Sequence, residues 1–139
     1  FFIYSLDSVS PPSVASIATD RIYRTANMFG RPGDVNVGFG GNLNTNSNWF
    51  KALTAAKTGE AIQLAPSKGI WELRSLDGNV IGRMSKNFKS TIPAAHVCKE
   101  ARVAWKVIRQ HDPIRDAGYT TPKNSEWPVV VPKFIFEPI

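Results

Sequence analysis

The chain has 139 residues, of which 42% are hydrophobic and 20% charged, a composition that excludes a disordered chain and suffices for one domain with its own core. Its single cysteine, Cys98, excludes an intrachain disulfide, and no apolar run is long enough to span a membrane, so we expect a cytoplasmic protein with no membrane partner. The formal net charge is +6 and the first residue is not methionine, so we expect a basic piece of a larger polypeptide.

The first 60 residues are rich in turn-forming residues. Residues 10–22 could form a short helix opened by Pro11 and Pro12, a turn is predicted at 30–34, and the apolar run 35–39 is a candidate strand. A helix is predicted from Ser47 or Asn48 to Gly59, because a capping residue precedes apolar residues at helical spacing. The residues expected to face inward are Val14, Ile17, Ala18 and Ile22 in the first helix and Trp49, Phe50, Leu53 and Ala56 in the second.

Strand patterns dominate the second half. Residues 61–64 are a short strand candidate, and residues 70–84 predict a β-hairpin because two apolar runs flank the turn Asp77-Gly78. Residues 127–136 are rich in valine and phenylalanine. Pro128 and Pro132 each lack a backbone donor, however, which predicts a strand at a sheet edge or two short pieces.

Residues 97–110 fit two patterns. In a helix, Val97, Ala101, Ala104, Trp105 and Ile108 would form one apolar stripe. In a strand, Ala101, Val103, Trp105 and Val107 would face the core, and the β-branched and tryptophan content favours this reading slightly. Either geometry is expected to place Arg102 and Lys106 on one exposed face.

Together these elements predict a single α+β domain built on a small twisted antiparallel sheet or a partly open β-barrel, with one or two helices. Residues 61–139 would form the β-rich core module. Residues 1–60 would wrap or cap it.

The positive charge is confined to one stretch of the chain. Between Arg83 and Arg109 there are seven basic residues and one acidic residue, whereas the rest of the chain has ten of each. Such a segment is typical of a surface for a negatively charged partner, and we expect nucleic acid, DNA rather than RNA; the alternative is a charged face that contacts only solvent. The expected nucleic-acid-binding residues are Arg83, Lys86, Phe88, Lys89, Lys99, Arg102, Lys106 and Arg109.

Aromatic side chains interleaved with basic ones can stack on unpaired bases. Trp105 alternates with Val103 and Val107, which predicts that it is buried. Phe88, between Lys86 and Lys89, is therefore the predicted stacking residue.

The sequence offers little for catalysis. His96 and Cys98 have no second cluster that would complete a zinc site, and the run Gly38-Phe39-Gly40-Gly41 lacks the lysine and hydroxyl of a phosphate loop. Asp112 and Asp116 lie four residues apart, but Arg115 would compete with a metal for their carboxylates. We therefore expect no enzyme, no metal and no cofactor.

Several short motifs resemble a known family. They are Ile70-Trp71-Glu72-Leu73, Asp77-Gly78-Asn79-Val80-Ile81-Gly82-Arg83-Met84, Ala101-Arg102-Val103-Ala104 and Trp127-Pro128-Val129-Val130-Val131-Pro132-Lys133-Phe134-Ile135-Phe136. With them, residues 61–139 resemble the C-terminal accessory region of large bacterial helicases of the RecQ family. The stretch 78–82 followed by Lys86 is also similar to the hairpin of HIRAN domains, small β-rich modules attached to helicases that bind DNA ends.

The resemblance and the basic segment together lead us to expect a non-catalytic nucleic-acid-binding accessory module of a larger, helicase-like DNA-processing protein. The alternative is a protein-interaction or assembly module that pairs through a C-terminal edge strand. In that case Trp127, Val129, Val131 and Phe134 would contact the partner.

Overall fold

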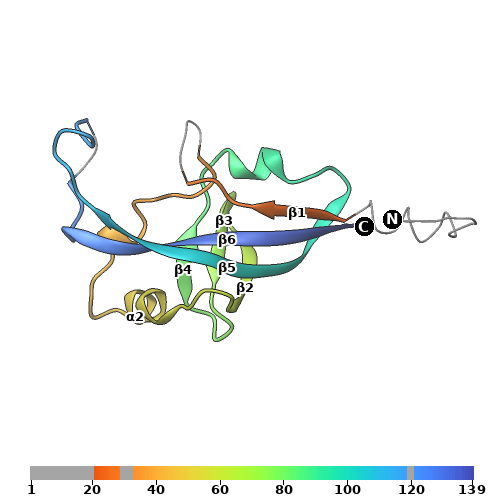
Figure 1. The fold of residues 1–139 in the computed structure, drawn as a ribbon, viewed down its shortest axis with the longest axis horizontal. Coiled ribbons are helices and arrows are strands. Elements are labelled where there is room, and N and C mark those ends of the chain that lie inside the picture. Colours follow the sequence, from red (N-terminus) through yellow and green to blue (C-terminus); the bar gives the residue numbers. More distant parts are fainter. Residues whose placement is uncertain (1–20, 29–32, 119–120) are drawn as a thin grey trace, which may run out of the picture.

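A computed structural model describes residues 21–28, 33–118 and 121–139. They form a six-stranded antiparallel sheet whose strand order is β1-β6-β5-β2-β3-β4, so that its two edge strands do not meet and the sheet stays open (Figure 1). Its elements are β1 (Ile22–Thr25), η1 (Gly40–Asn42), α2 (Asn48–Ala55), β2 (Ala61–Ser67), β3 (Ile70–Arg74), β4 (Val80–Arg83), η2 (Phe88–Thr91), β5 (His96–Gln110) and β6 (Glu126–Pro138). This confirms the predicted small α+β fold with an open sheet.

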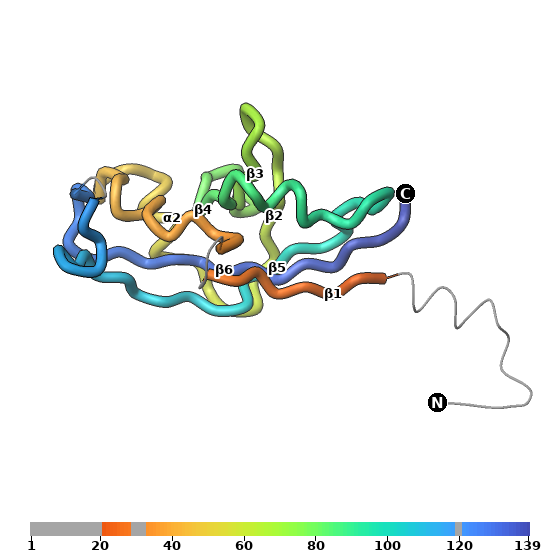
Figure 2. Tube along the Cα trace, turned by 90° about the horizontal axis from the view of Figure 1, so that it is seen from above, coloured from red at the N-terminus to blue at the C-terminus, as the bar shows by residue number. Residues whose placement is uncertain are grey.

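The sheet folds over on itself into two layers. β1, β6 and β5 form a long layer, and β2 leaves it: β2 pairs with β5 at Ala61 and Ile62 and then with β3 from Gln63 onward. In Figure 2, β3, β4 and α2 all lie on one side of the long layer. One core cluster joins the two layers, and its largest fully buried side chains are Leu53, Leu73, Ile81, Met84, Phe88, Val103, Val130, Val131, Pro132, Phe134 and Phe136.

The local signals in the sequence correspond to the observed helix and hairpin. Ser47 precedes α2, and its Oγ accepts a hydrogen bond from the Phe50 backbone N at 3.1 Å, as expected of an N-cap. β3 and β4 pair as the predicted hairpin. Gly78 has a φ of +91° in the connecting turn, a conformation that costs glycine little and other residues more. The hairpin and the start of the helix are confirmed, whereas α2 ends at Ala55 and not at the predicted Gly59.

β5 resolves the ambiguity at residues 97–110 in favour of a strand, but its alternation is interrupted. The register against β6 shifts twice, at Cys98/Glu100 and at Val103/Trp105. At the second shift Val103 lies opposite Pro132 and Trp105 lies opposite Val131, so β5 accommodates an extra residue, Ala104, as a bulge. An extra residue reverses which face the following side chains occupy. The bulge therefore separates the side chains that precede it on β5 from those that follow it.

Two expectations for β5 are wrong for this reason. Residues that lie opposite each other on neighbouring strands project from the same face. Arg102 lies opposite Lys133, and Trp105 lies opposite Val131, which is two residues from Lys133 on β6. Trp105 therefore shares a face with Arg102 and is 45% exposed rather than buried. Lys106 lies opposite Val130 and so projects from the other face, not from the face of Arg102.

The predicted edge strand at 127–136 is wrong for residues 133–136, which pair with both β1 and β5, whereas β1 does not reach residues 127–131. β6 lies between β1 and β5, and the four residues proposed to contact a partner, Trp127, Val129, Val131 and Phe134, are buried. The prolines are tolerated because their backbone N and carbonyl groups face away from β5. The Pro132 carbonyl shows this orientation, since it accepts a hydrogen bond from the Ala26 backbone N at 2.9 Å. Pro128, four residues earlier on the same strand, has the same orientation, so neither proline removes a bond to β5.

The remaining expectations concern the first 40 residues. The candidate strand at 35–39 is reduced to a single bridge between Val35 and Met84, and turns follow it. Ile22, expected on a helix, is the first residue of β1. Arg21 is not helical either. Residues 10–20 of the predicted helix and most of the turn at 30–34 lie outside the described residues.

Candidate nucleic-acid interface

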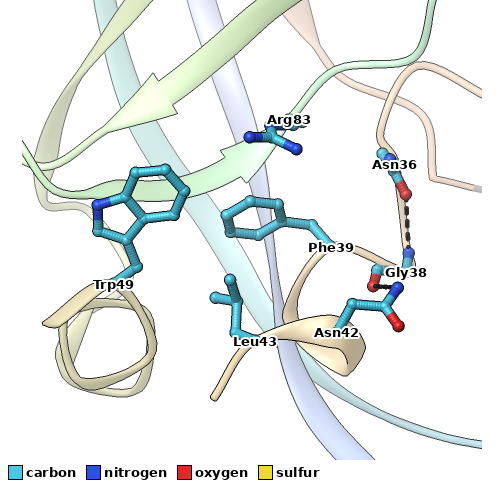
Figure 3. Close-up of a pocket in the computed structure, with 7 residues that line it drawn as sticks. All are labelled: Asn36, Gly38, Phe39, Asn42, Leu43, Trp49 and Arg83. Atoms are coloured by element: carbon cyan, nitrogen blue, oxygen red, sulfur yellow. Dashed lines mark hydrogen bonds between the residues drawn. The ribbon is translucent and has the colours of Figure 1, made fainter. Parts of the chain in front are cut away.

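A small cavity opens where η1, α2 and the end of β4 meet. Its volume is about 220 Å³. It is lined by Asn36, Gly38, Phe39, Asn42, Leu43, Trp49 and Arg83, and Figure 3 shows the Arg83 guanidinium above the rings of Phe39 and Trp49. Ligand pockets for drug-sized molecules are usually about 300–1,000 Å³, so this one suits a single small group of a longer ligand.

Two aromatic rings form one side of the cavity. Trp49 comes from the first turn of α2, which begins where Ser47 caps it. Phe39 comes from a loop in which the Gly38 N donates to Asn36 Oδ1 at 3.0 Å and Asn42 Nδ2 donates to the Gly38 carbonyl at 3.3 Å. The ring centroids are 6.2 Å apart with an interplanar angle of 27°, which is a stacked pair.

Arg83 is held in place at its Nε while the rest of its guanidinium stays available. Its Nε donates to Glu72 Oε2 at 3.3 Å, and the guanidinium carbon lies 5.3 Å from the centre of the Phe39 ring. The side chain is 42% exposed. Among the described residues nothing accepts a hydrogen bond from its two Nη groups, so up to four donors remain for a ligand.

The charges around Glu72 leave this site positive. Arg74 Nη2 also donates to Glu72, to Oε1 at 3.0 Å, and the Glu72 carboxylate is buried. Two guanidinium groups therefore share one carboxylate. The group of three keeps one net positive charge, and Arg83 is its member at the cavity.

The predicted basic residues do not form one continuous surface. Arg83 lies at the cavity. Lys86 lies just before η2 and Lys89 lies within it, and the other four basic residues lie on β5. Because Arg24 Nη1 donates to the Thr91 carbonyl at 3.1 Å, η2 is next to β1. Lys86, Lys89 and Lys99 are exposed and have no ion pair within the part of the chain that the structure describes.

The remaining three basic residues on β5 already have partners in the protein. Arg102 pairs with Glu100 and donates from Nη1 to the Gly59 carbonyl at 3.0 Å. Lys106 Nζ donates to the Thr54 carbonyl in the last turn of α2 at 2.6 Å, where a cation is favourable. Arg109 lies 3.3 Å from Asp116. These bonds give the three residues structural roles.

The expected stacking residue is wrong. Phe88 is 0% exposed and packs against Phe134, with 5.5 Å between the ring centroids. It cannot reach a base, because the first residue of η2 turns its side chain into the core. The sequence reading also missed Phe39, whose signal is a single aromatic residue within a glycine-rich loop, and assigned Trp49 to the core.

The residues considered for catalysis have ordinary structural surroundings. Cys98 is half-buried, which raises the pKa of its thiol. Arg115 donates to both carboxylate oxygens of Asp116 at 3.0 Å, so Arg115 occupies this carboxylate. Within residues 21–28, 33–118 and 121–139, no group of three or more His, Cys, Asp and Glu side chains is placed to hold a metal ion.

Comparison of the chain with protein-family models, with curated proteins and with solved structures gave no match. Among the described residues, no helix has the length and apolar character needed to cross a membrane.

Proposed function

We propose that this chain is a non-catalytic nucleic-acid-binding accessory module of a larger, helicase-like DNA-processing protein. The observation that carries the proposal is the Arg83 guanidinium, which is fixed beside a stacked aromatic pair and keeps unused donors at the mouth of a cavity. A fixed guanidinium fork matches the oxygens of a phosphate. The aromatic face for a base would be that of Trp49, which is 36% exposed, because Phe39 is only 8% exposed and supports Trp49 and Arg83 from below.

We call Arg83 and the neighbouring Phe39–Trp49 pair the anchor. The anchor would bind one nucleotide of the nucleic acid whatever its base. Its volume admits one small group, and Asn36 and Asn42 supply polar atoms at its rim. Lys86 and Lys89, which follow Arg83 along the chain, would neutralise further phosphates without contacting bases. The resemblance of residues 61–139 to helicase accessory regions agrees with this assignment and supplies the expected parent protein.

The first prediction tests Arg83. Arg83→Ala should weaken DNA binding by about 1.5–3 kcal/mol, the usual value of a hydrogen bond to a charged group. Arg83→Lys, which keeps the charge but loses the fork, should recover only part of that loss.

The second prediction concerns the two lysines. Lys86→Glu combined with Lys89→Glu should lower the slope of log K against log salt by about two, since each lost phosphate contact removes roughly one unit. Fluorescence anisotropy with labelled DNA measures all three.

Lys68→Ala is the matched control, because Lys68 is an exposed lysine in the turn between β2 and β3, outside the basic segment. Thermal melting of each variant separates a binding effect from unfolding, since Arg83 also contacts the buried Glu72. If Arg83→Ala stays folded and binds DNA as tightly as the unmodified chain does, the anchor is wrong. If the unmodified chain binds no DNA, the proposed function is wrong.

A further inference from the structure

The outer face of the β1–β6–β5 layer displays two aromatic side chains. Tyr23 on β1 is 67% exposed and Trp105 on β5 is 45% exposed. Figure 2 shows β3, β4 and α2 together on one side of this layer. Single exposed apolar side chains are common on protein surfaces, so the arrangement of these two aromatics, and not their exposure alone, carries the argument.

The strand register shows that the two aromatics share this face. Tyr23 and Glu100 both lie opposite Ile135 of β6, and Trp105 lies opposite Val131. Residues 131 and 135 have the same parity on a regular strand, so their partners project from the same face, on which Lys133 is exposed and Val131 is fully buried. Tyr23 and Trp105 are separated by four residues along the strand direction and by two strand spacings across the sheet. This separation corresponds to about 16 Å.

A basic row lies between the two aromatics. Thr25 and Arg102 both lie opposite Lys133, halfway between the Tyr23 row and the Trp105 row. Arg102 pairs with Glu100, whereas Lys133 has no ion pair in the described part of the chain. Across the face the rows are Tyr23 with Glu100, then Arg102 with Lys133, then Trp105, and the Glu100 charge is balanced by Arg102. The centre of a protein–protein interface is usually depleted of charge, so this order favours a nucleic acid over a protein.

We propose that this outer face, defined by Tyr23, Lys133 and Trp105, binds single-stranded nucleic acid, with bases stacked on the two aromatics and a phosphate near Lys133. The inference rests on the proposed function and adds which form of nucleic acid is bound. Bases in a duplex already stack on one another, so only an unpaired strand can present base faces to side chains on a sheet. This face would extend the contact beyond the Arg83 cavity.

The test uses the 139-residue chain and a labelled oligothymidine of about 12 nucleotides, within the roughly 4–16 nucleotides bound by single-strand-binding folds. The unmodified chain should bind this strand more tightly than a duplex of the same length. Tyr23→Ala and Trp105→Ala should each weaken binding about 5- to 100-fold, the range of a lost base stack. Ile108→Ala is the matched control, because Ile108 is an exposed residue of the same strand that lies opposite Pro128 and so projects from the other face.

A second measurement covers the case in which Trp105→Ala does not fold. Photo-crosslinking of the unmodified chain to a strand that contains iodouracil should label the peptides with Tyr23 and Trp105. The inference is wrong if labelling is confined to Phe39 and Trp49, if the duplex binds as tightly as the single strand, or if folded Tyr23→Ala and Trp105→Ala bind normally. If those two variants bind normally while Arg83→Ala does not, the proposed function stands without this face. If no DNA binds the unmodified chain, both proposals fail.

Discussion

Asp116 organises the turn that connects β5 and β6. Its carboxylate accepts hydrogen bonds from Arg115 Nε at 3.0 Å and from the Asp112 backbone N at 3.0 Å, and Arg109 Nη2 lies 3.3 Å away. The Arg115 guanidinium is the main reason that the pKa of Asp116 is far below its usual range, followed by the backbone N of Asp112. An exposed turn at the end of two strands is thus held by one ionised side chain.

The pH dependence of stability should report this arrangement. Because the pKa of Asp116 is lower in the folded chain than in the unfolded one, its contribution is present above the usual aspartate pKa of about 3.9 and is lost as pH falls through the lower, folded value. Asp116→Asn should therefore lower the melting temperature at pH 7, and the difference from the unmodified chain should shrink below about pH 4. Melting curves between neutral and acidic pH measure it, and a difference independent of pH would contradict the assignment.

At the scale of elements, the signals that predicted correctly are local ones. Ser47 ahead of an apolar helical pattern and Asp77-Gly78 between two strands each specify their element through neighbouring residues. The bulges in β5 have no such signal, because Ala104 is an ordinary strand residue whose extra position is visible only against β6. For the same reason the exposure of Trp105 could not be read from alternation. The burial of Phe88 depends instead on the packing of η2 against Phe134 of β6, which is also not a local signal.

The candidate site was predictable only in part. A basic segment that contains Arg83 is visible in the sequence, because charge is a property of composition. The cavity needs Phe39 and Trp49 from two other segments, and it forms only when η1 and α2 pack beside the end of β4. A single sequence does not specify that juxtaposition, since it depends on how the two layers close.

Deletion of Ala104 tests the bulge in β5. Without the extra residue, Trp105 would move to the face of Val103, which is fully buried, and Lys106 to the outer face. A tryptophan does not fit that packed core without displacing neighbours, and Lys106 would lose the Thr54 carbonyl. The deletion should therefore lower the melting temperature sharply, whereas Ala104→Ser should change it little. Equal melting temperatures for the deletion and the unmodified chain would show that the bulge is not required.

At the scale of the whole molecule, one core cluster joins both layers. Phe88 from η2 contacts Phe134 of β6, and the rings of Phe134 and Phe136 are 5.7 Å apart. The same cluster contains Leu53 of α2 and Leu73 of β3. Because it connects every layer of the fold, we expect the described part of the chain to unfold as one cooperative unit.

Phe88→Ala should therefore act on stability and not directly on binding. Removal of a fully buried phenylalanine costs about 3–5 kcal/mol in the free energy of unfolding. Urea denaturation measures this cost, and Ile114→Ala is the control because Ile114 is 90% exposed in the loop between β5 and β6. If Phe88→Ala were as stable as the unmodified chain but bound DNA more weakly, Phe88 would be a stacking residue after all.

The central position of β6 affects how the chain is synthesised and folded. β6 pairs with β1, where Ile22 meets Phe136, and with β5 along most of its length, so the long layer cannot close without residues 126–138. Contacts between positions so far apart along a chain form slowly, because the intervening loop must close first. On the ribosome, β1 and β5 emerge before their shared neighbour and leave unpaired edges and apolar side chains exposed. Chaperones and competing strands therefore have their best access in the interval before Pro138 is released from the exit tunnel.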